Sequence, residues 1–223
     1  MSVTAQPTTT FQPVQPASLT ESVLVQIRRA IINHELQPQE RLIETDLAEQ
    51  FQVSRATVRQ ALLQLRYEGL VDIRPRRGAV VTRMSVEAAY DVCVVRGLLE
   101  SWAARAACTS LTAAQLEAMR GLSRQMGECL RTGDMYGLVV SDVAFHRYIC
   151  GADPNACLGE HWQSLNALHG ALMSAHLACY TYDPEGVTAM HDNLCDVLEH
   201  HDPELAEQSI RLHYVRVRGV GPG

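Results

Sequence analysis

Six consecutive segments with helical spacing fill the last two thirds of the 223-residue sequence, and none shows the alternation of a β-strand. This pattern restricts that part of the chain to an all-helical fold. The segment starts carry capping signals at Ser85, Thr112, Asp134 and Asp153, which Pro154 follows. A series of capped helices predicts an antiparallel α-helical bundle, over residues 85–109, 112–131, 134–150, 154–181, 185–201 and 203–218.

The N-terminal third predicts a different, smaller unit. Three helices are expected over 19–35, 44–51 and 55–67, followed by strand, turn and strand over 70–73, 74–78 and 79–82. Three short helices and a β-hairpin are the elements of a winged helix-turn-helix. The predicted fold class is therefore mainly α, with an N-terminal winged helix-turn-helix over 18–83 and the C-terminal antiparallel bundle over 84–218. Residues 1–17 carry no charge and are rich in Thr, Gln and Pro, so we expect a disordered tail.

Charge is distributed unevenly along the chain. Residues 54–83 hold seven Arg and two acidic residues, a net of +5, whereas the whole chain carries −6. A short basic block on an acidic chain predicts a local site for a polyanion.

The basic block coincides with the predicted third helix and hairpin. Ser54 is expected to cap that helix, and Arg55, Thr57 and Arg59 fall on its outer, N-terminal side. Arg76 and Arg77 occupy the tip of the hairpin. The helix residues are suited to base edges in a DNA groove, and the hairpin residues to an adjacent groove or the backbone. Taken alone, the arginine pair of the helix is equally compatible with a solvated helix face.

Residues 19–83 resemble the DNA-binding domain of the GntR superfamily of bacterial transcription regulators. The matching residues are Arg41-Leu42, Leu47-Ala48, Val53-Ser54-Arg55, Val58-Arg59, Ala61-Leu62, Leu65, Glu68-Gly69-Leu70-Val71 and Arg77-Gly78-Ala79-Val80-Val81. The resemblance implies DNA contacts by Arg41, Ser54, Arg55, Thr57, Arg59, Arg76, Arg77 and Gly78. The sequence departs from the family pattern at Phe51-Gln52, Ala56-Thr57 and Gln60, so the operator sequence is not predicted.

Polar residues stand on the inward stripes of three bundle helices. Asp142 and His146 lie four apart on the core-facing side of 134–150, and His191 and His213 fall on the apolar stripes of the last two helices. An isolated buried carboxylate is costly unless it is paired or bound to a metal. Each histidine alone is compatible with an ordinary hydrogen-bonded core residue. The four together predict a divalent metal site, suited to Zn²⁺ or to Ni²⁺, Mn²⁺ or Fe²⁺.

Two further features accompany these residues. Arg96 and Glu100 lie on the apolar side of the first bundle helix. They form either an internal salt bridge or an arginine, held by the glutamate, that receives a carboxylate ligand. His169 runs along one flank of 154–181 beside Trp162, where it either lines a pocket or packs against a neighbouring helix.

Residues 85–218 resemble the FCD effector domain, which defines the FadR subfamily of GntR regulators. The matching residues are Val95-Arg96, Glu100, Asp142, Phe145-His146, Asn155, His191 and His213. The resemblance implies that Asp142, His146, His191 and His213 bind a divalent metal beside which a small organic acid docks. Arg96, Glu100, Asn155 and His169 are the candidate contacts of that acid. The sequence departs from the family at Met190 and Asp192, and 154–181 contains no Arg, so the effector is not identified.

These features predict a metabolite-responsive DNA-binding transcription regulator without enzymatic activity. A winged helix reads few base pairs, so we expect a homodimer on a roughly palindromic operator. Repression is the commoner outcome in the family. Two alternatives stay open: a metalloenzyme that uses the Asp and three His residues, and a regulator whose metal is purely structural.

Cysteine usage and hydropathy bear on the compartment. The seven cysteines are an odd number, sit in apolar helical segments and form no C-x-x-C pair, which favours a reducing cytoplasm over a secreted scaffold. The uncharged stretch 161–182 is long enough to span a bilayer but contains three histidines together with Gln163, Ser164 and Asn166. Because these are costly in lipid, a buried bundle helix is expected, with no membrane partner.

Overall fold

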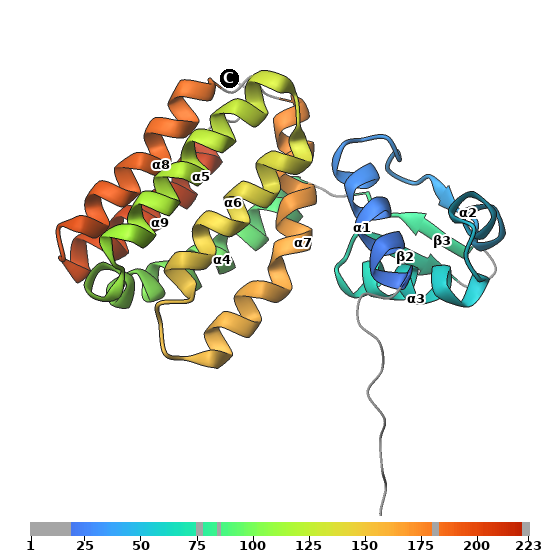
Figure 1. Ribbon diagram of the computed structural model, residues 1–223, viewed down its shortest axis with the longest axis horizontal. Coiled ribbons are helices and arrows are strands. Elements are labelled where there is room, and N and C mark those ends of the chain that lie inside the picture. The colour runs from blue at the N-terminus through green and yellow to red at the C-terminus, as the bar shows by residue number, and fades with distance from the viewer. Residues whose placement is uncertain (1–18, 75–77, 84–85, 180–182, 220–223) are drawn as a thin grey trace, which may run out of the picture.

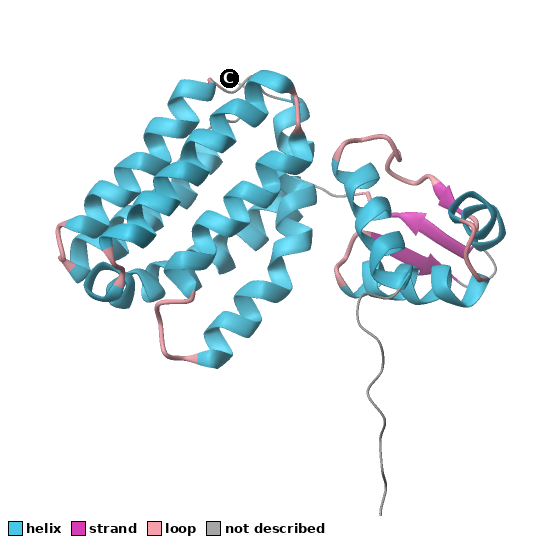
Figure 2. Cartoon of the chain, viewed as in Figure 1, coloured by secondary structure: helices cyan, strands magenta, loops and turns pink. Residues whose placement is uncertain are grey.

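The structure, a computed structural model, describes residues 19–74, 78–83, 86–179 and 183–219. In these residues nine helices and three short strands form two units (Figure 1). The first unit is a winged helix-turn-helix and contains all the strands, whereas the second is a bundle of helices (Figure 2). The predicted fold class is confirmed.

The winged helix begins with three helices: α1 (Leu19–Ile32), α2 (Glu44–Phe51) and α3 (Arg55–Tyr67). Its antiparallel sheet has the order β1-β3-β2, from β1 (Arg41–Leu42), β2 (Val71–Arg74) and β3 (Gly78–Val81). The predicted hairpin is thus present, while β1 was not predicted, because two residues are too few to show alternation. The first helix ends at Ile32 and not at residue 35, since His34 adopts a left-handed φ of 57°.

Local signals and packing together fix the position of α3. The Ser54 hydroxyl accepts a hydrogen bond from the Thr57 backbone N–H at 3.1 Å, as its predicted capping role requires. Gly69 follows the helix with a φ of +77°, a conformation that favours glycine. One face is fully buried, through Val58, Ala61, Leu62 and Leu65. Each buried leucine contributes about 1.5–3 kcal/mol, and this burial turns the opposite face of α3 to solvent.

The bundle helices match the predicted segments within two residues at each end. Thr112 and Gln115 form the predicted capping box, and Asp134 accepts from the Gly137 N–H at 2.9 Å. The helices are α4 (Val86–Ser110), α5 (Ala113–Thr132), α6 (Met135–Cys150), α7 (Ala156–Cys179), α8 (Pro184–Glu199) and α9 (Pro203–Gly219).

Helix α4 is central in the bundle. It packs against α9, α7, α6 and α8, while α5 covers α6 and α8 from the other side. Its fully buried Ala103, Ala104 and Ala107 allow the neighbouring helices to approach closely. Side chains from α4, α6, α7, α8 and α9 can therefore meet at one place in the interior. Among the described helices, α7 included, none combines the length and apolar character needed to cross a bilayer.

Candidate metal centre and nucleic-acid interface

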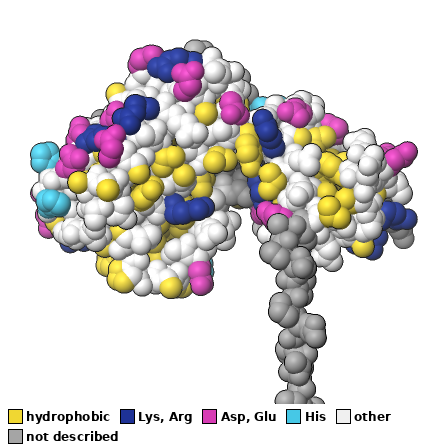
Figure 3. Space-filling view, in the orientation of Figure 1, with side chains coloured by type: hydrophobic (Ala, Val, Ile, Leu, Met, Phe, Trp, Pro, Cys, Tyr) yellow, Lys and Arg dark blue, Asp and Glu magenta, His cyan; other side chains and the backbone are white. Residues whose placement is uncertain are grey.

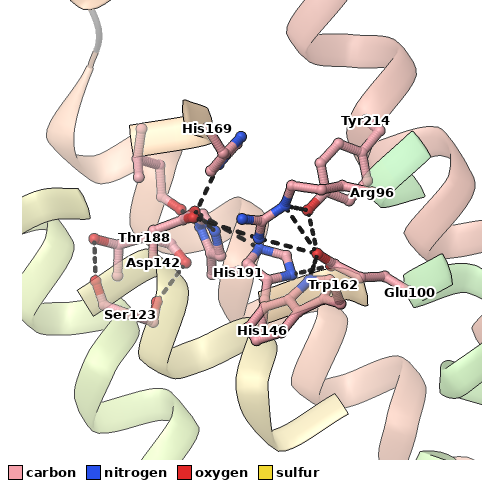
Figure 4. A network of polar contacts seen from close by, with 11 residues as sticks. Arg96, Glu100, Ser123, Asp142, His146, Trp162, His169, Thr188, His191 and Tyr214 are labelled. Atoms are coloured by element: carbon pink, nitrogen blue, oxygen red, sulfur yellow. Dashed lines mark hydrogen bonds and ion pairs between the residues drawn. The ribbon is translucent and has the colours of Figure 1, made fainter. Parts of the chain in front are cut away.

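The structure brings the four predicted metal ligands together inside the bundle. Asp142 and His146 come from α6, His191 from α8 and His213 from α9, and each is less than one-tenth exposed. One ring nitrogen of each histidine lies within 4.8 Å of the others. Asp142 Oδ1 lies 3.6 Å from His146 Nε2 and 3.7 Å from His191 Nε2 (Figure 4). Three imidazoles and one carboxylate thus surround one small volume.

Hydrogen bonds on the outer side of this cluster set the direction of its lone pairs. His191 Nδ1 donates to the Val187 carbonyl at 2.8 Å, which leaves its Nε2 as the inward acceptor. His146 Nδ1 lies 2.6 Å from Glu100 Oε2, so its Nε2 also faces inward. Carboxylates and carbonyls commonly hold metal-binding histidines in this way.

Unpartnered atoms in the cluster fit a bound cation. Within the described residues, His191 Nε2 and His213 Nδ1 are buried and have no hydrogen-bond partner. Leaving a buried polar atom unsatisfied costs about 1–3 kcal/mol. A divalent transition metal would satisfy both atoms, and imidazole with carboxylate is a suitable donor set for it.

The charges of the cluster also suit a cation. Burial opposes ionisation of Asp142, but His146 and the contacts with His169 and His191 outweigh it and hold its pKa well below the usual value. Burial, followed by the proximity of His191 and His146, holds the pKa of His213 well below its usual value. At neutral pH the carboxylate is charged and His213 is neutral, which are the protonation states of metal ligands.

Arg96 and Glu100 form a second, fully buried network beside the cluster (Figure 4). Arg96 Nη2 lies 3.0 Å from Glu100 Oε1, and the same oxygen accepts from the Tyr214 hydroxyl at 2.6 Å and from Trp162 Nε1. Arg96 Nη1 donates to Asn166 Oδ1 at 2.9 Å. The internal salt bridge considered from the sequence is therefore present.

The network touches the predicted ligands on two sides. His146 contacts Glu100, and Arg96 Nη2 lies 4.0 Å from Asp142 Oδ2. Burial opposes the charge of Glu100, but His146 and Arg96 lower its pKa to about 2. Arg96 is thus a fixed cation next to the candidate metal centre.

The two remaining candidate effector contacts differ in position. His169 is buried, and its Nε2 donates to Asp142 Oδ2 at 3.2 Å. Asn155 is exposed at the start of α7, where its Oδ1 accepts from the Cys157 N–H at 3.1 Å. Asn155 is the residue that caps this helix, and the structure does not bring it to the network.

Sequence reasoning missed two members of the network. Tyr214 was overlooked because the apolar stripe of its helix passes through Ile210 and His213 and leaves the next residue aside. Asn166 was noticed only as a polar residue in an uncharged helix. Its position four before Gly170 on α7 gave no sign that it accepts from an arginine on α4.

The predicted DNA contacts lie on or near the exposed side of α3. Ser54, Arg55 and Arg59 are exposed, and Thr57 is half-buried. Arg59 pairs with Glu44 of α2 at 2.9 Å. Arg41 is exposed on β1, and Gly78 begins β3 with a φ of +75°. Arg76 and Arg77 lie outside the described residues.

A winged helix with an arginine-bearing third helix, joined to a helical bundle with a buried polar centre, is the architecture of a two-domain DNA-binding regulator. Residues 19–81 match the family described as "Bacterial regulatory proteins, gntR family", and residues 91–216 match the "FCD domain". The chain belongs to the gntR family and carries an FCD domain. It is a transcriptional regulator of that type, with a DNA-binding N-terminal domain.

Proteins of similar sequence carry the names of transcriptional regulators. The HTH-type transcriptional regulator LutR of Bacillus subtilis (strain 168) is 32% identical over 154 residues, which cover 62% of this chain and 69% of the relative. The HTH-type transcriptional repressor RspR of Escherichia coli (strain K12) is 24% identical over 208 residues, covering 92% and 89%. Among solved structures, E. coli McbR/YncC matches the fold with a TM-score of 0.73 at 22% identity, over 92% of this chain and 97% of that one.

Proposed function

We propose that this regulator is a cytoplasmic homodimeric repressor whose bundle binds a divalent metal and a small organic acid, and whose DNA affinity responds to that acid. The observation that carries the proposal is the convergence of Asp142, His146, His191 and His213 around buried nitrogens that lack partners among the described residues. We also propose that the two domains divide between residues 83 and 84; the tail predicted over 1–17 lies outside the described residues.

The four convergent residues would hold the metal, for which Zn²⁺ is the first candidate and Ni²⁺, Mn²⁺ or Fe²⁺ the others. A bound ion with an open position supplies a positive centre for a carboxylate oxygen. The chain's own residues support such a ligand. Arg96 offers a fixed positive charge 4.0 Å from Asp142, and Glu100 pairs with that arginine. His169 lies 3.2 Å from Asp142 Oδ2.

DNA would be bound through α3 and the hairpin. Arg55, Thr57 and Arg59 would contact base edges, and Ser54 and Arg41 would contact the backbone. Arg76, Arg77 and Gly78 of the hairpin would reach an adjacent groove. Repression is proposed because relatives such as RspR carry that name.

A dimer is proposed from an exposed apolar stripe on α4. Val94, Val95, Leu98 and Trp102 are 40%, 44%, 55% and 61% exposed, although they are large apolar side chains. Apolar patches of this kind mark protein interfaces. Two copies related by a two-fold axis would present two winged helices to a roughly palindromic operator.

The metal centre is tested by calorimetric titration of metal-stripped protein with Zn²⁺. His146→Ala should abolish high-affinity binding, because it removes one of three convergent nitrogens. His161→Ala is the matched control, since His161 is exposed at the start of α7 and should leave binding unchanged. Equal affinities in the two variants would refute the proposed ligand set.

The sensory role is tested with a panel of small carboxylic acids in thermal-shift and DNA-binding assays. We expect an acid that stabilises the Zn²⁺-loaded protein and releases it from DNA. A purely structural metal would instead lower the melting temperature on chelation without changing the affinity for any acid. Turnover of an acid would favour the metalloenzyme.

DNA recognition is tested by selecting binding sequences from random duplexes and measuring affinity by fluorescence anisotropy. Arg55→Ala should weaken binding by about tenfold or more, because a bidentate arginine–guanine contact is worth about 1–3 kcal/mol. Arg124→Ala, an exposed arginine on α5, is the control and should bind like wild type. Wild-type affinity in Arg55→Ala would remove that residue from the interface.

A further inference from the structure

The winged helix touches the bundle through the end of α1. The Asn33 side-chain oxygen accepts a hydrogen bond from the backbone N–H of Tyr136 at 3.1 Å, and the Arg29 guanidinium lies 5.7 Å from the centre of the Tyr136 ring. Tyr136 is in the first turn of α6, so a residue of the DNA-binding half satisfies a free N–H at the start of a bundle helix. Figure 3 shows hydrophobic side chains gathered on the bundle where the two halves meet.

The middle of α7 makes two more contacts with the DNA-binding half. A methyl group added to Gly170 would lie 2.5 Å from Val139 Cγ1 and 3.7 Å from Ile32 Cδ1, so α7, α6 and α1 meet there with no spare space. A methyl group added to Gly69 would lie 3.3 Å from Leu168 Cδ1. Because Gly69 terminates α3, residues 168 and 170 touch the ends of both α3 and α1.

His169 stands between these two contact residues and reaches in the other direction. Its Nε2 donates to Asp142 Oδ2 at 3.2 Å, inside the bundle (Figure 4). Its Nδ1 is buried and has no hydrogen-bond partner in the described part of the chain. The other oxygen of Asp142 faces His146 and His191. One short segment of α7 therefore contacts a candidate metal ligand and the DNA-binding half at once.

We propose that the Asp142–His169 hydrogen bond couples the candidate metal centre to the DNA-binding half. Leu168 and Gly170, the neighbours of His169 on α7, transmit the change through their contacts with Gly69 and Ile32. The inference rests on the proposed function. With the bond formed, α7 is held to α6, and residues 168 and 170 brace α1 and α3. When Asp142 turns to another partner, α7 is released at this point while Asn33 still holds α6.

A ligand shifts an equilibrium only between states that it binds with unequal affinity. Loss of the Asp142–His169 bond must therefore favour one arrangement of the winged helix relative to the bundle. Helix shifts of about 1–2 Å are a common form of such transitions. The contact between Gly170 and Val139 leaves no room for an added methyl group, so a movement of this size between α6 and α7 would change the packing at this point, which lies beside Ile32.

Hydrogen–deuterium exchange on the full-length protein tests this coupling. His169→Ala should raise exchange by about threefold or more in peptides covering residues 30–36 and 66–72, because the braced segments open more often. A peptide covering α2, which lies away from the contact, should not change. Arg124→Ala is the surface control and should match wild type in all three peptides.

A second variant and a metal titration complete the test. Gly170→Ala leaves every proposed ligand in place but forces Val139 aside, so it should raise exchange in the same two peptides even if His169→Ala fails to fold. Wild-type exchange in a folded His169→Ala, or in Gly170→Ala, would overturn the coupling. Titration with Zn²⁺ alone is run in parallel: absence of binding would refute the proposed metal, while the comparison of variants still decides the coupling.

Discussion

Glu100 is the side chain on which the buried polar network depends most. Its Oε1 receives Arg96, Tyr214 and Trp162, and its Oε2 receives His146. Each of these donors is almost fully buried, so each would lose its partner in a place that water does not reach. The glutamate therefore stabilises the fold and orients a candidate metal ligand at the same time.

We expect Glu100→Gln to destabilise the metal-free protein by about 3–5 kcal/mol, because it removes the nearer counter-charge of the buried Arg96 and leaves only Asp142, 4.0 Å away. Glu207→Gln is the matched control. Its partners Arg105 and Arg211 each lie 2.9 Å away but are 40% and 56% exposed, so the loss should stay at or below about 1 kcal/mol. Chemical denaturation of both variants measures the difference. Similar losses of unfolding free energy in the two variants would mean that the buried network contributes no more to stability than a surface ion pair does.

The same carboxylate predicts how stability responds to acid. Its pKa in the folded protein is about 2, against an ordinary value of 4.5. A lowered folded-state pKa contributes stability that is present above pH 4.5 and lost as the pH falls towards 2. Unfolding free energy of the metal-free wild type should therefore fall across this window. The fall should be shallower in Glu100→Gln; an unchanged slope would contradict the assignment.

At the scale of single elements, two helix caps allow an effect on stability to be distinguished from an effect on DNA binding. Ser54 caps α3 and Thr112 caps α5 with the same chemistry. Replacing either with alanine should cost about 1 kcal/mol of stability. Only Ser54→Ala should also weaken DNA binding, because it removes the proposed backbone contact of Ser54 and because fraying of α3 displaces Arg55 and Thr57. Denaturation and anisotropy on both variants test this, and equal DNA affinities would place the start of α3 away from DNA.

Of all features of the fold, the positions of the helices were predicted best from the sequence. Periodicity and caps placed the bundle helices within two residues, because each signal is local. Prediction failed where a distant partner decides the structure. Arg41 and Leu42 form a strand only because β3 lies beside them. Asn155 is a different case, because its neighbours in the chain decide what it contacts: its Oδ1 accepts from the Leu158 N–H at 3.3 Å, as a helix cap does, and its role in a ligand pocket stays a prediction from the resemblance.

The candidate metal centre was predictable for a related reason. Asp142, His146, His191 and His213 stand on apolar stripes, where a polar residue is conspicuous in the sequence alone. The contacts between the two halves carry no such signal. Asn33 and Tyr136 are 103 positions apart, and both are ordinary polar residues at helix ends. Only the docking of α1 on α6 brings them together, so the coupling route could not be inferred from the sequence.

At the scale of the whole molecule, the exposed stripe on α4 predicts how two copies assemble. Leu98→Asp combined with Trp102→Asp places two charges in the middle of the proposed interface, where desolvation without partners is unfavourable. We expect the double variant to be a folded monomer by light scattering, since both side chains are more than half exposed.

The monomer should also lose most of its affinity for a two-half-site operator, because each winged helix then binds independently. Its dependence on salt should weaken in parallel, since fewer phosphates are neutralised per binding event. Substituting Val140→Asp, on an exposed position of α6 that is 48% accessible, controls for the added charge. A dimeric Leu98→Asp/Trp102→Asp variant with full DNA affinity would show that the copies associate through another surface, and the paired arrangement of the winged helices would then follow from that surface instead of from α4.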